Sequence, residues 1–341
     1  MNRREFLASA TFLKALPGYR YEFPRDNFSH ADFQTEWWYY TGNLFTASGR
    51  PFGFELTFFR QALQPEVEMK SVWSTRDAYM AHLALSDVER KQFLYAERLN
   101  RPGPGLAGAD AALQKIWNGN WSCLLKPDIH HLTAVDPRFE FSLDLRPLKA
   151  PVIHGKEGVS LKGTKPGEAS QYISFTRLAT TGSITVDKKR YEVSGNAWMD
   201  HEIFSSELDD SLAGWDWFSI QLDNNTELML YSLRKKDGSS SDYSAGTFID
   251  EKGKPTHLDK NDFLLTPGRK WKDYPVEWQI ELPRLGIKLA CRPRMDAQEL
   301  ISKSKLTPSY WEGACIFTGT HQGSGYLEMT GYDQKLRFMP R

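Results

Sequence analysis

The sequence of 341 residues has no excess charge and no long apolar run. Its 43 basic residues balance its 43 acidic residues, so the overall charge gives no reason to expect a nucleic-acid or anionic-membrane partner. No stretch approaches the roughly 18 apolar residues that a transmembrane helix requires. We therefore expect no nucleic-acid partner and no integral membrane segment, and the sequence leaves open whether the protein is a monomer or a homodimer.

Cysteine is scarce. Cys123, Cys291 and Cys315 are odd in number and far apart, and no CxxC or Cys/His ligand spacing occurs. A disulfide framework and a zinc site are both disfavoured, although one pair could bridge in an oxidising compartment. The eight histidines are scattered and no HExxH motif occurs, so we predict no metal and no cofactor.

The motifs of the common hydrolases are also absent. No G-x-S-x-G elbow occurs, and Ser324 lies in a Gly-Ser-Gly stretch that is typical of a turn. No cysteine has the local signature of a cysteine protease. A hydrolase is therefore the least supported of the enzyme classes.

Aromatic residues, by contrast, are abundant, with 11 Trp, 14 Tyr and 20 Phe. Large rings fill the cores of β proteins, and they also line wide apolar pockets. Short alternating segments separated by Gly, Pro, Asn and Asp are typical of strands, and helical periodicity is confined to residues 90–99 and 205–210. We expect strands at residues 36–44, 52–60, 77–86, 117–125, 131–134, 139–145, 172–178, 183–186, 191–197, 215–222, 227–234, 244–249, 276–282, 287–293, 310–318 and 325–332.

An internal repeat defines the architecture. The segment WWYYTGNL at residues 37–44 resembles WDWFSIQL at residues 215–222, and the strand after each ends in an arginine, Arg60 or Arg234. So many strands at this spacing favour a sandwich or barrel over βαβ units. The matched order predicts an all-β protein of two antiparallel β-barrels in tandem, at residues 21–205 and 206–341.

Residues 1–20 are expected to precede both barrels, as an export signal or a disordered leader. The stretch RREFL at residues 3–7 is similar to the twin-arginine motif, and a short apolar run follows it. This pattern predicts a periplasmic or secreted protein. A cytoplasmic location stays open, because no clear A-x-A cleavage site follows.

The triplet Asp200-His201-Glu202 is the main candidate for acid–base chemistry. In a strand, Asp200 and Glu202 point to one face and His201 points to the other. A carboxyl group facing an aromatic interior would have a raised pKa and act as an acid, and a buried neutral His201 would act as a base or hydrogen-bond donor. The alternative is that the triplet ends a strand and pairs with Arg or Lys at the barrel rim.

The same alternation sorts the aromatic strands into faces. A face that carries Glu, Trp and Tyr together suits an apolar pocket with one polar group, and it equally suits a barrel core with a hydrogen-bonded tyrosine. On the first interpretation, the expected ligand-binding residues are Glu36, Trp38, Tyr40, Trp215, Trp217 and Trp311.

Four segments, at residues 23–44, 195–202, 214–234 and 310–332, together resemble the AttH-like and carotenoid 1,2-hydratase-like family. The resemblance covers nearly the whole chain, and the segments follow in the family's order. It implies two lipocalin- or streptavidin-like barrels in tandem, in which an exchange of C-terminal strands is a further option.

In the hydratase branch of this family, which adds water to the terminal double bond of acyclic carotenoids, the resemblance implicates a His, a Trp two residues later and a Tyr-Asp pair downstream. His201 matches the His, but Ile203 stands where the Trp is found. Tyr231 matches the tyrosine, and Ser232 rather than Asp follows it. The sequence is thus more similar to the AttH-like branch, and the candidate catalytic residues are Asp200, His201, Glu202 and Tyr231.

The expected function is the binding of an apolar, isoprenoid- or lipid-like molecule in a barrel, and the expected reaction is acid-assisted hydration or a related lyase or isomerase reaction. Hydration of an alkene passes through a carbocation, which Trp and Tyr faces stabilise by about 0.5–2 kcal/mol each. The main alternative is a non-catalytic extracytoplasmic carrier of a hydrophobic ligand, and a secreted hydrolase is the second alternative.

Overall fold

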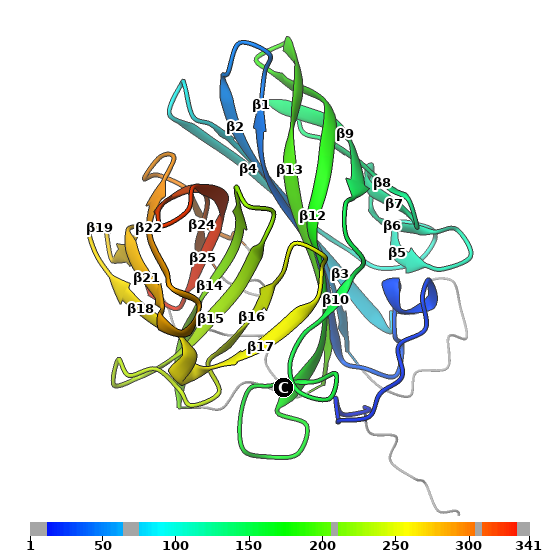
Figure 1. The fold of residues 1–341 in the computed structure, drawn as a ribbon. Coiled ribbons are helices and arrows are strands. Elements are labelled where there is room, and N and C mark those ends of the chain that lie inside the picture. Colours follow the sequence, from blue (N-terminus) through cyan, green and yellow to red (C-terminus); the bar gives the residue numbers. More distant parts are fainter. Residues whose placement is uncertain (1–11, 64–74, 206–210, 304–308, 333–341) are drawn as a thin grey trace, which may run out of the picture.

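The computed structural model describes residues 12–63, 75–205, 211–303 and 309–332. Within these ranges the chain forms β-strands and three short 3-10 helices, at Arg25–Asn27, Lys260–Asp262 and Pro283–Leu285. The strands make two large, curled antiparallel sheets that stand side by side as barrel-like halves (Figure 1). The all-β class and the tandem arrangement predicted from the sequence are confirmed.

The first sheet has the order β4-β3-β2-β1-β13-β12-β9-β8-β7-β6-β5, and two short strands, β10 and β11, also pair with β12. The sheet curls so that β4, at one end of this order, comes near β6, close to the other end. Side chains connect the two strands there, since Asn100 Nδ2 donates a hydrogen bond to Asn118 Oδ1 at 2.6 Å. The strands are β1 Thr35–Phe45, β2 Pro51–Ala62, β3 Asp77–Asp87, β4 Gln92–Asn100, β5 Ala107–Asp110, β6 Lys115–Asn118, β7 Trp121–Lys126, β8 Ile129–Val135, β9 Phe139–Pro147, β10 Val152–Ile153, β11 Ser160–Leu161, β12 Ala169–Val186 and β13 Lys189–Phe204.

The second sheet has the order β17-β16-β15-β14-β25-β24-β22-β21-β18, with β23 paired to β24 and a separate small hairpin of β19 and β20. Its strands are β14 Leu212–Leu222, β15 Glu227–Lys235, β16 Ala245–Ile249, β17 Pro255–Asp259, β18 Leu264–Pro267, β19 Lys270–Trp271, β20 Tyr274–Pro275, β21 Trp278–Leu282, β22 Ile287–Pro293, β23 Glu299–Leu300, β24 Tyr310–Gly319 and β25 Gly323–Thr330.

Each sheet is built from one continuous part of the chain. Among the described strands, β1 to β13 pair with one another and β14 to β25 pair with one another, so no strand is exchanged between the halves. The predicted domain boundary at residues 205 and 206 stays a prediction, because residues 206–210 lie outside the described ranges. The twin-arginine-like stretch at residues 3–7 also lies outside them. No helix in the described part of the chain is long and apolar enough to span a membrane.

The two repeated strands bury both faces. Trp38 and Tyr40 of β1 project into the core of the first barrel, and Phe218 and Ile220 of β14 project into the core of the second. The alternate residues, with Tyr39 as an example, belong to a third apolar cluster that lies between the sheets. A strand covered on both faces explains the near-continuous apolar sequence of each repeat.

One expected helix is wrong. Most of residues 90–99 belongs to strand β4, which pairs along its whole length with β3. Leu94 and Ala96 pack on the barrel core from this strand. Strong helix formers such as these are overruled because alternation places them where β3 offers backbone partners. The other expected helix, at residues 205–210, lies almost wholly outside the described residues.

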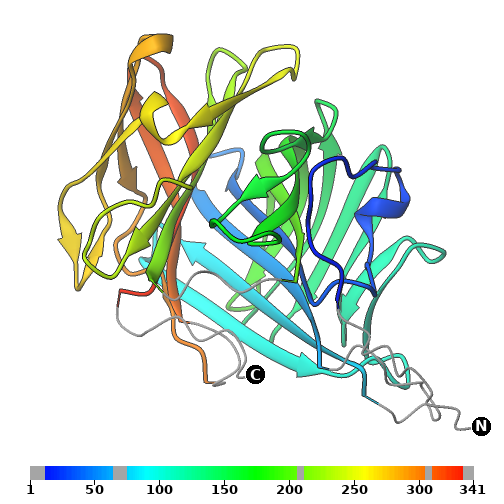
Figure 2. The same cartoon turned by 90° about the horizontal axis from the view of Figure 1, so that it is seen from below.

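The N-terminal segment covers one end of the first barrel (Figure 2). Phe28 belongs to the core of this barrel, and Trp38 Nε1 donates a hydrogen bond to the carbonyl oxygen of Asn27 at 2.9 Å. An apolar side chain inserted at a barrel end removes that end from solvent. The interior of the first barrel is therefore a filled core at this end.

Candidate functional site

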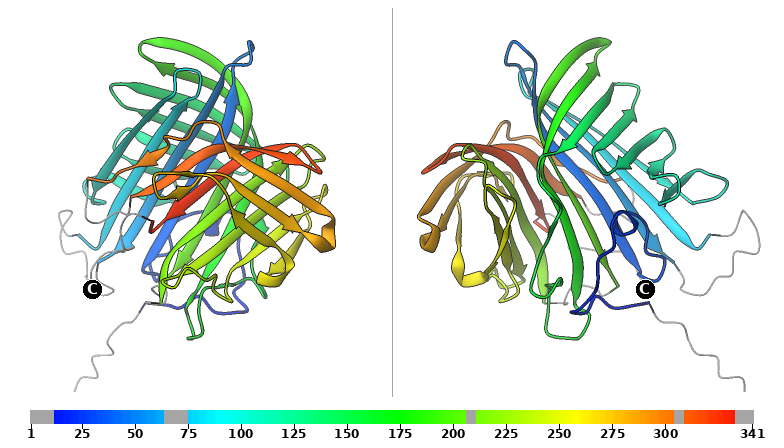
Figure 3. Two further views of the ribbon diagram at one scale, coloured as in Figure 1. Left: turned by 90° about the vertical axis from the view of Figure 1, so that its left-hand side faces the viewer. Right: turned by 45° about the vertical axis from the view of Figure 1, so that its right-hand side comes forward.

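The two barrels meet along outward faces that carry polar and aromatic side chains. Strand β1 packs against β25, β2 against β24, and β12 against β14, and we call this shared region the barrel seam (Figure 3). The approach is close on β2, where a Cβ atom on Gly53 would lie 2.8 Å from Ala314 Cβ and 2.8 Å from Tyr326 Oη. Polar groups in the seam are consequently shielded from water.

The Asp200-His201-Glu202 triplet is divided between two faces of β13, as strand alternation predicts. Asp200 and Glu202 project into the seam. His201 projects into the first barrel, where its ring stacks on Trp38 with centroids 4.8 Å apart. Asp200, His201 and Glu202 are 3 %, 1 % and 6 % exposed, so none of the three lies at a solvent-exposed rim.

The Asp200 carboxyl group accepts hydrogen bonds from three donors. Tyr172 Oη and Trp198 Nε1 each lie 2.6 Å from one of its oxygens, and Ser174 Oγ is the third donor. Trp217, on the second sheet, donates to Tyr172 Oη at 2.9 Å, which leaves the phenol hydrogen for Asp200. Burial nevertheless raises the pKa of Asp200 to about 7, because the hydrogen bonds offset only part of the cost of burying its charge.

A neutral histidine extends this network to the second sheet. His154 Nε2 lies 2.7 Å from Ser174 Oγ, and Nδ1 lies 2.8 Å from Thr247 Oγ1 on β16. Burial lowers the pKa of His154 to about 3, and the nearby charge of Lys162 acts in the same direction. One ring nitrogen therefore donates and the other accepts, so the chain of hydrogen bonds is continuous.

Glu202, unlike Asp200, has a cationic partner. Lys162 Nζ lies 3.2 Å from Glu202 Oε1, and Ser170 Oγ donates to the same oxygen. The ammonium group also lies 4.0 Å from the ring centroid of Tyr231, whose hydroxyl is 2.9 Å from Ser160 Oγ. The structure thus brings four residues predicted from the sequence into one region of the seam: Asp200, Glu202, Trp217 and Tyr231.

Three further carboxyl groups lie in the seam, on Glu55 of β2, Glu312 of β24 and Glu328 of β25. Glu312 and Glu328 stand opposite each other on paired strands. Tyr39 Oη donates to Glu312 at 2.5 Å, and Trp215 Nε1 donates to Glu328 at 3.0 Å. The described partners of all three groups are hydroxyl and indole donors rather than cations.

These carboxyl groups hold protons more tightly than free glutamate does. Burial raises the pKa of Glu55 to about 7 and that of Glu328 to about 8, and the charges of Glu55 and Asp200 add to the effect on Glu328. Burial and the charges of Glu55 and Glu328 raise the pKa of Glu312 well above its usual range. Acids that repel one another in a low dielectric titrate together, so the seam retains carboxylic acid at neutral pH.

Two buried acceptors beside these acids have no hydrogen-bond partner among the described residues, His82 Nε2 and Glu312 Oε2. Tyr310 Oη donates to Glu55 at 3.0 Å and lies 2.5 Å from His82 Nδ1. Since the single phenol hydrogen goes to Glu55, the ring of His82 donates through Nδ1 and Nε2 keeps a bare lone pair. Burial lowers the pKa of His82 to about 3, which keeps this ring neutral. Unsatisfied atoms this deep mark positions where water or a ligand would be held.

The seam differs in character at its two ends. Beside the acids, half-buried rings form an aromatic wall: the centroid of Trp37 lies 4.9 Å from that of Phe204 and 6.5 Å from that of Phe59, which in turn lies 5.2 Å from His82. At the other end is an open cleft of about 510 Å³, whose lining includes the polar residues Asn43, Arg177, Asn196, Gln221 and Ser324.

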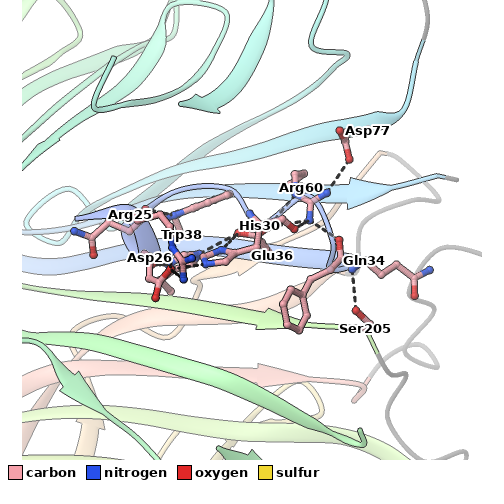
Figure 4. A network of polar contacts seen from close by, with 12 residues as sticks. Arg25, Asp26, His30, Gln34, Glu36, Trp38, Arg60, Asp77 and Ser205 are labelled. Atoms are coloured by element: carbon pink, nitrogen blue, oxygen red, sulfur yellow. Dashed lines mark hydrogen bonds and ion pairs between the residues drawn. The ribbon is translucent and has the colours of Figure 1, made fainter. Parts of the chain in front are cut away.

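The remaining predicted site residues lie inside the barrels. Trp38 and Tyr40 belong to the core of the first barrel, and Trp311 belongs to the core of the second. Glu36 lies in a polar network at the end of the first barrel (Figure 4), and its Oε2 lies 3.3 Å from His201 Nε2. The predicted ligand-binding residues therefore occupy three separate places, and Trp215 and Trp217 are the two that line the seam.

The network at the barrel end joins the N-terminal segment to β1 and β2. Arg60 Nη2 lies 2.8 Å from Glu36 Oε1 and donates to the carbonyl oxygens of His30 and Phe33 at 2.7 and 2.5 Å. Burial alone would raise the pKa of Glu36, but the Arg60 charge and the neighbouring histidines hold it below its usual range. Burial likewise opposes a charge on His30, yet Asp26 and Glu36 raise its pKa to about 9.

The site residues predicted from the sequence do not include Glu55, Glu312 or Glu328. Each is an acid within a segment correctly expected to be a strand, flanked by apolar or small residues, as in Phe54-Glu55-Leu56. An acid at an outward position of a strand is ordinary when that face meets water. Such an acid indicates a site only when a second sheet covers its face, and that packing is a property of the tertiary structure.

The described fold and site define a class of protein: an all-β double barrel with an acidic, aromatic seam between its halves. The model of the family described as AttH-like matches residues 14–332, and the chain belongs to this family. The family resemblance seen in the sequence is thus confirmed. A search of the curated proteins found no match.

Two solved structures are similar. A structure described as an AttH of Nitrosomonas europaea superposes with a TM-score of 0.84 at 32 % identity, over 94 % of this chain and 100 % of that chain. Kievitone hydratase of Nectria haematococca superposes with a TM-score of 0.69 at 13 % identity, over 96 % of this chain and 97 % of that chain. The second likeness shows a shared fold alone.

Proposed function

We propose that the protein binds an apolar, isoprenoid- or lipid-like molecule at the aromatic end of the barrel seam and adds water to one of its carbon–carbon double bonds. The observation that carries the proposal is a group of carboxyl groups set among Trp and Tyr rings, of which those on Glu55, Asp200 and Glu312 are buried and that on Glu328 is half-buried. A carboxylic acid that stays protonated at neutral pH can protonate a base as weak as an alkene.

Glu328 is the proton donor in this proposal. Its pKa of about 8 keeps it protonated at neutral pH, and its described side-chain hydrogen bond comes from Trp215. The π pair of the alkene takes the Glu328 proton to form a C–H bond, and the neighbouring carbon becomes a cation. Water attacks that carbon and loses a proton to Asp200, whose carboxylate is held by three donors. Exchange with solvent then returns the proton to Glu328.

The aromatic side chains of the seam suit the cationic intermediate. Trp215 and Trp217 occupy alternate positions of β14 on the seam side, and Tyr39 packs edge-on against Trp217 with centroids 5.3 Å apart. Each ring facing a cation is worth about 0.5–2 kcal/mol, and more when the site is dry. A similarly folded protein bears the name kievitone hydratase, which supports water addition as the reaction type.

The test uses lycopene, an acyclic carotenoid, dispersed in detergent and incubated with the full chain. Liquid chromatography with mass spectrometry should detect a product heavier by one water. We expect Glu328→Gln to lower the rate by about 100-fold or more, the usual worth of a general acid. Glu192→Gln is the matched control, because this exposed glutamate pairs with Arg190 on the surface.

A carrier is distinguished in the same experiment. If lycopene binds and is recovered unchanged, the seam holds a ligand but performs no hydration, and the carrier replaces the hydratase. If lycopene neither binds nor reacts, an isoprenoid-binding seam is refuted. If lycopene is hydrated equally well by wild type and by the Glu328 and Asp200 variants, the acid assignment is wrong.

A further inference from the structure

We propose that His30, Glu36 and His201 bind one divalent transition-metal ion, with Zn²⁺ as the best fit, at the end of the first barrel. Each of the three residues offers one ligand atom, and these atoms lie within 4.8 Å of one another. The three residues come from the N-terminal segment, β1 and β13, so their spacing in the sequence does not indicate a metal site. The site is separate from the seam, and the proposal does not rest on the proposed function.

The outer nitrogen of each imidazole is already bonded to Asp26. His201 Nδ1 lies 3.1 Å from the backbone carbonyl oxygen of Asp26, and His30 Nε2 lies 3.1 Å from its carboxylate Oδ1. A carbonyl oxygen and a carboxylate are acceptors, so each ring, when it is neutral, uses its single hydrogen there. The inner nitrogens, His30 Nδ1 and His201 Nε2, then direct lone pairs at Glu36 Oε2. Three electron-rich atoms facing one point form an unfavourable arrangement unless a cation lies between them.

The distances fit an ion better than hydrogen bonds. Glu36 Oε2 lies 3.3 Å from both His30 Nδ1 and His201 Nε2. A charge-assisted N–H···O bond is normally about 2.7–2.9 Å long. By contrast, two ligands about 2.05 Å from a tetrahedral ion stand about 3.3 Å apart, and Zn²⁺ has this bond length to His nitrogen and carboxylate oxygen.

The contacts of the other carboxylate oxygen of Glu36 are shorter, so the two 3.3 Å distances are specific to Oε2. Its Oε1 accepts from the backbone N–H of His30 at 2.6 Å and from Arg60 Nη2 at 2.8 Å. One carboxylate oxygen is thus held by the protein and the other is presented to the two imidazoles. Metal-binding imidazoles commonly donate their outer N–H to a carboxylate or carbonyl oxygen, and Asp26 supplies both.

A proton is the competing occupant. His30 as an imidazolium would donate to Asp26 and Glu36 and satisfy both of its nitrogens. A neutral His201 would still have one hydrogen for two acceptors, Asp26 O and Glu36 Oε2. A metal ion would instead give the inner nitrogen of each ring a partner. It would also cross-link the N-terminal segment to two strands of the barrel, and so stabilise the closed barrel end.

The experiment uses the full chain without a histidine tag, stripped of metal by a chelator and dialysed. One equivalent of Co²⁺ is added first, because tetrahedral Co²⁺ gives visible absorption bands, and Zn²⁺ is then added to displace it. We expect a tetrahedral Co²⁺ spectrum at a stoichiometry near one ion per chain, its loss on adding Zn²⁺, and a melting temperature that rises with Zn²⁺. Protein purified from zinc-supplemented cells should contain about one zinc per chain.

The variants are His30→Gln and, as a matched control, His131→Gln. His131 is also a histidine–carboxylate pair, with Nδ1 2.6 Å from Asp144 Oδ1, but it lies on the outer surface of β8. His30→Gln should weaken Co²⁺ binding at least tenfold, and His131→Gln should leave it unchanged. If His30→Gln does not fold, the wild-type spectrum decides alone. Absence of a tetrahedral spectrum and of any Zn²⁺-induced melting shift in the wild type overturns the proposal in favour of the proton.

Discussion

Asp200 and His201 are adjacent in sequence but serve different regions of the molecule. Asp200 lies 2.6 Å from Tyr172 Oη in the seam, whereas His201 Nε2 lies 3.3 Å from Glu36 Oε2 inside the first barrel. The alternation of a single strand, β13, produces this separation. A compact sequence motif therefore divides into a candidate catalytic group and a group that holds the barrel end.

This division predicts two different phenotypes. Asp200→Asn should lower lycopene hydration by about 100-fold, because an amide accepts a proton poorly, although its oxygen can keep the hydrogen bonds from Ser174 and Trp198. His201→Gln should lower the free energy of unfolding by about 1–3 kcal/mol, because it loses contacts with Asp26 and Glu36. Thermal unfolding and product analysis on both variants check this. The reverse pattern would show that His201, and not Asp200, is the reacting group.

The seam acids predict a loss of stability at alkaline pH. The folded-state pKa of Glu328, about 8, lies above its value of 4.5 in an unfolded chain, so the folded state binds the proton more tightly. The corresponding stability is fully present below pH 4.5 and is lost as pH rises to about 8. Urea unfolding from pH 5 to pH 8.5 should show a smaller loss for Glu328→Gln than for the wild type. An equal loss of stability in both proteins would mean that ionisation of Glu328 does not cause the loss.

The buried histidines predict the opposite trend on the acid side. Burial lowers the pKa of His130 to about 3, while its ring lies 3.0 Å from Tyr40 Oη in the core of the first barrel. Because the unfolded chain binds this proton more readily, stability present above pH 6.5 is lost as pH falls toward 3. His130→Gln should therefore show a shallower acid loss, by about 1.4 kcal/mol per pH unit in this window.

Close contact between the barrels predicts that the seam does not tolerate a side chain on Gly53. A Cβ atom there would lie 2.8 Å from both Ala314 Cβ and Tyr326 Oη. Gly53→Val should lower the free energy of unfolding by about 1–3 kcal/mol through overpacking. Ser48→Val, in the exposed turn between β1 and β2, is the control. Unchanged stability of Gly53→Val would show that the two sheets separate easily.

The sequence predicts the fold well because strand alternation and the repeated hairpin are local signals. The segments WWYYTGNL and WDWFSIQL form most of β1 and β14, which are the first strands of two equivalent hairpins. Trp38 and Phe218 on these strands face the two barrel cores. The same signals do not reveal what covers the outward faces. A ligand pocket inside a barrel was the natural expectation for Trp38 and Tyr40, yet these rings are packed in a core.

The candidate site depends on contacts between distant parts of the chain. Tyr39 and Glu312 meet across the seam at 2.5 Å, and nothing near either residue in the sequence indicates the other. His30 and His201 likewise come together from separate segments. Asp200 is predictable because an acid beside aromatic residues is unusual by itself. Its relation to Glu328 follows only from the packing of the second sheet on the first.

The most direct test of the central claim, that a seam acid protonates an alkene, follows the proton itself. The wild type and Glu328→Gln are incubated with lycopene in D₂O, and the deuterium on carbon in the product is measured by mass spectrometry. We predict one carbon-bound deuterium and one added hydroxyl group per hydrated double bond for the wild type, at a rate about 100-fold lower in the variant. Equal rates of deuterium incorporation in the two proteins would contradict the claim.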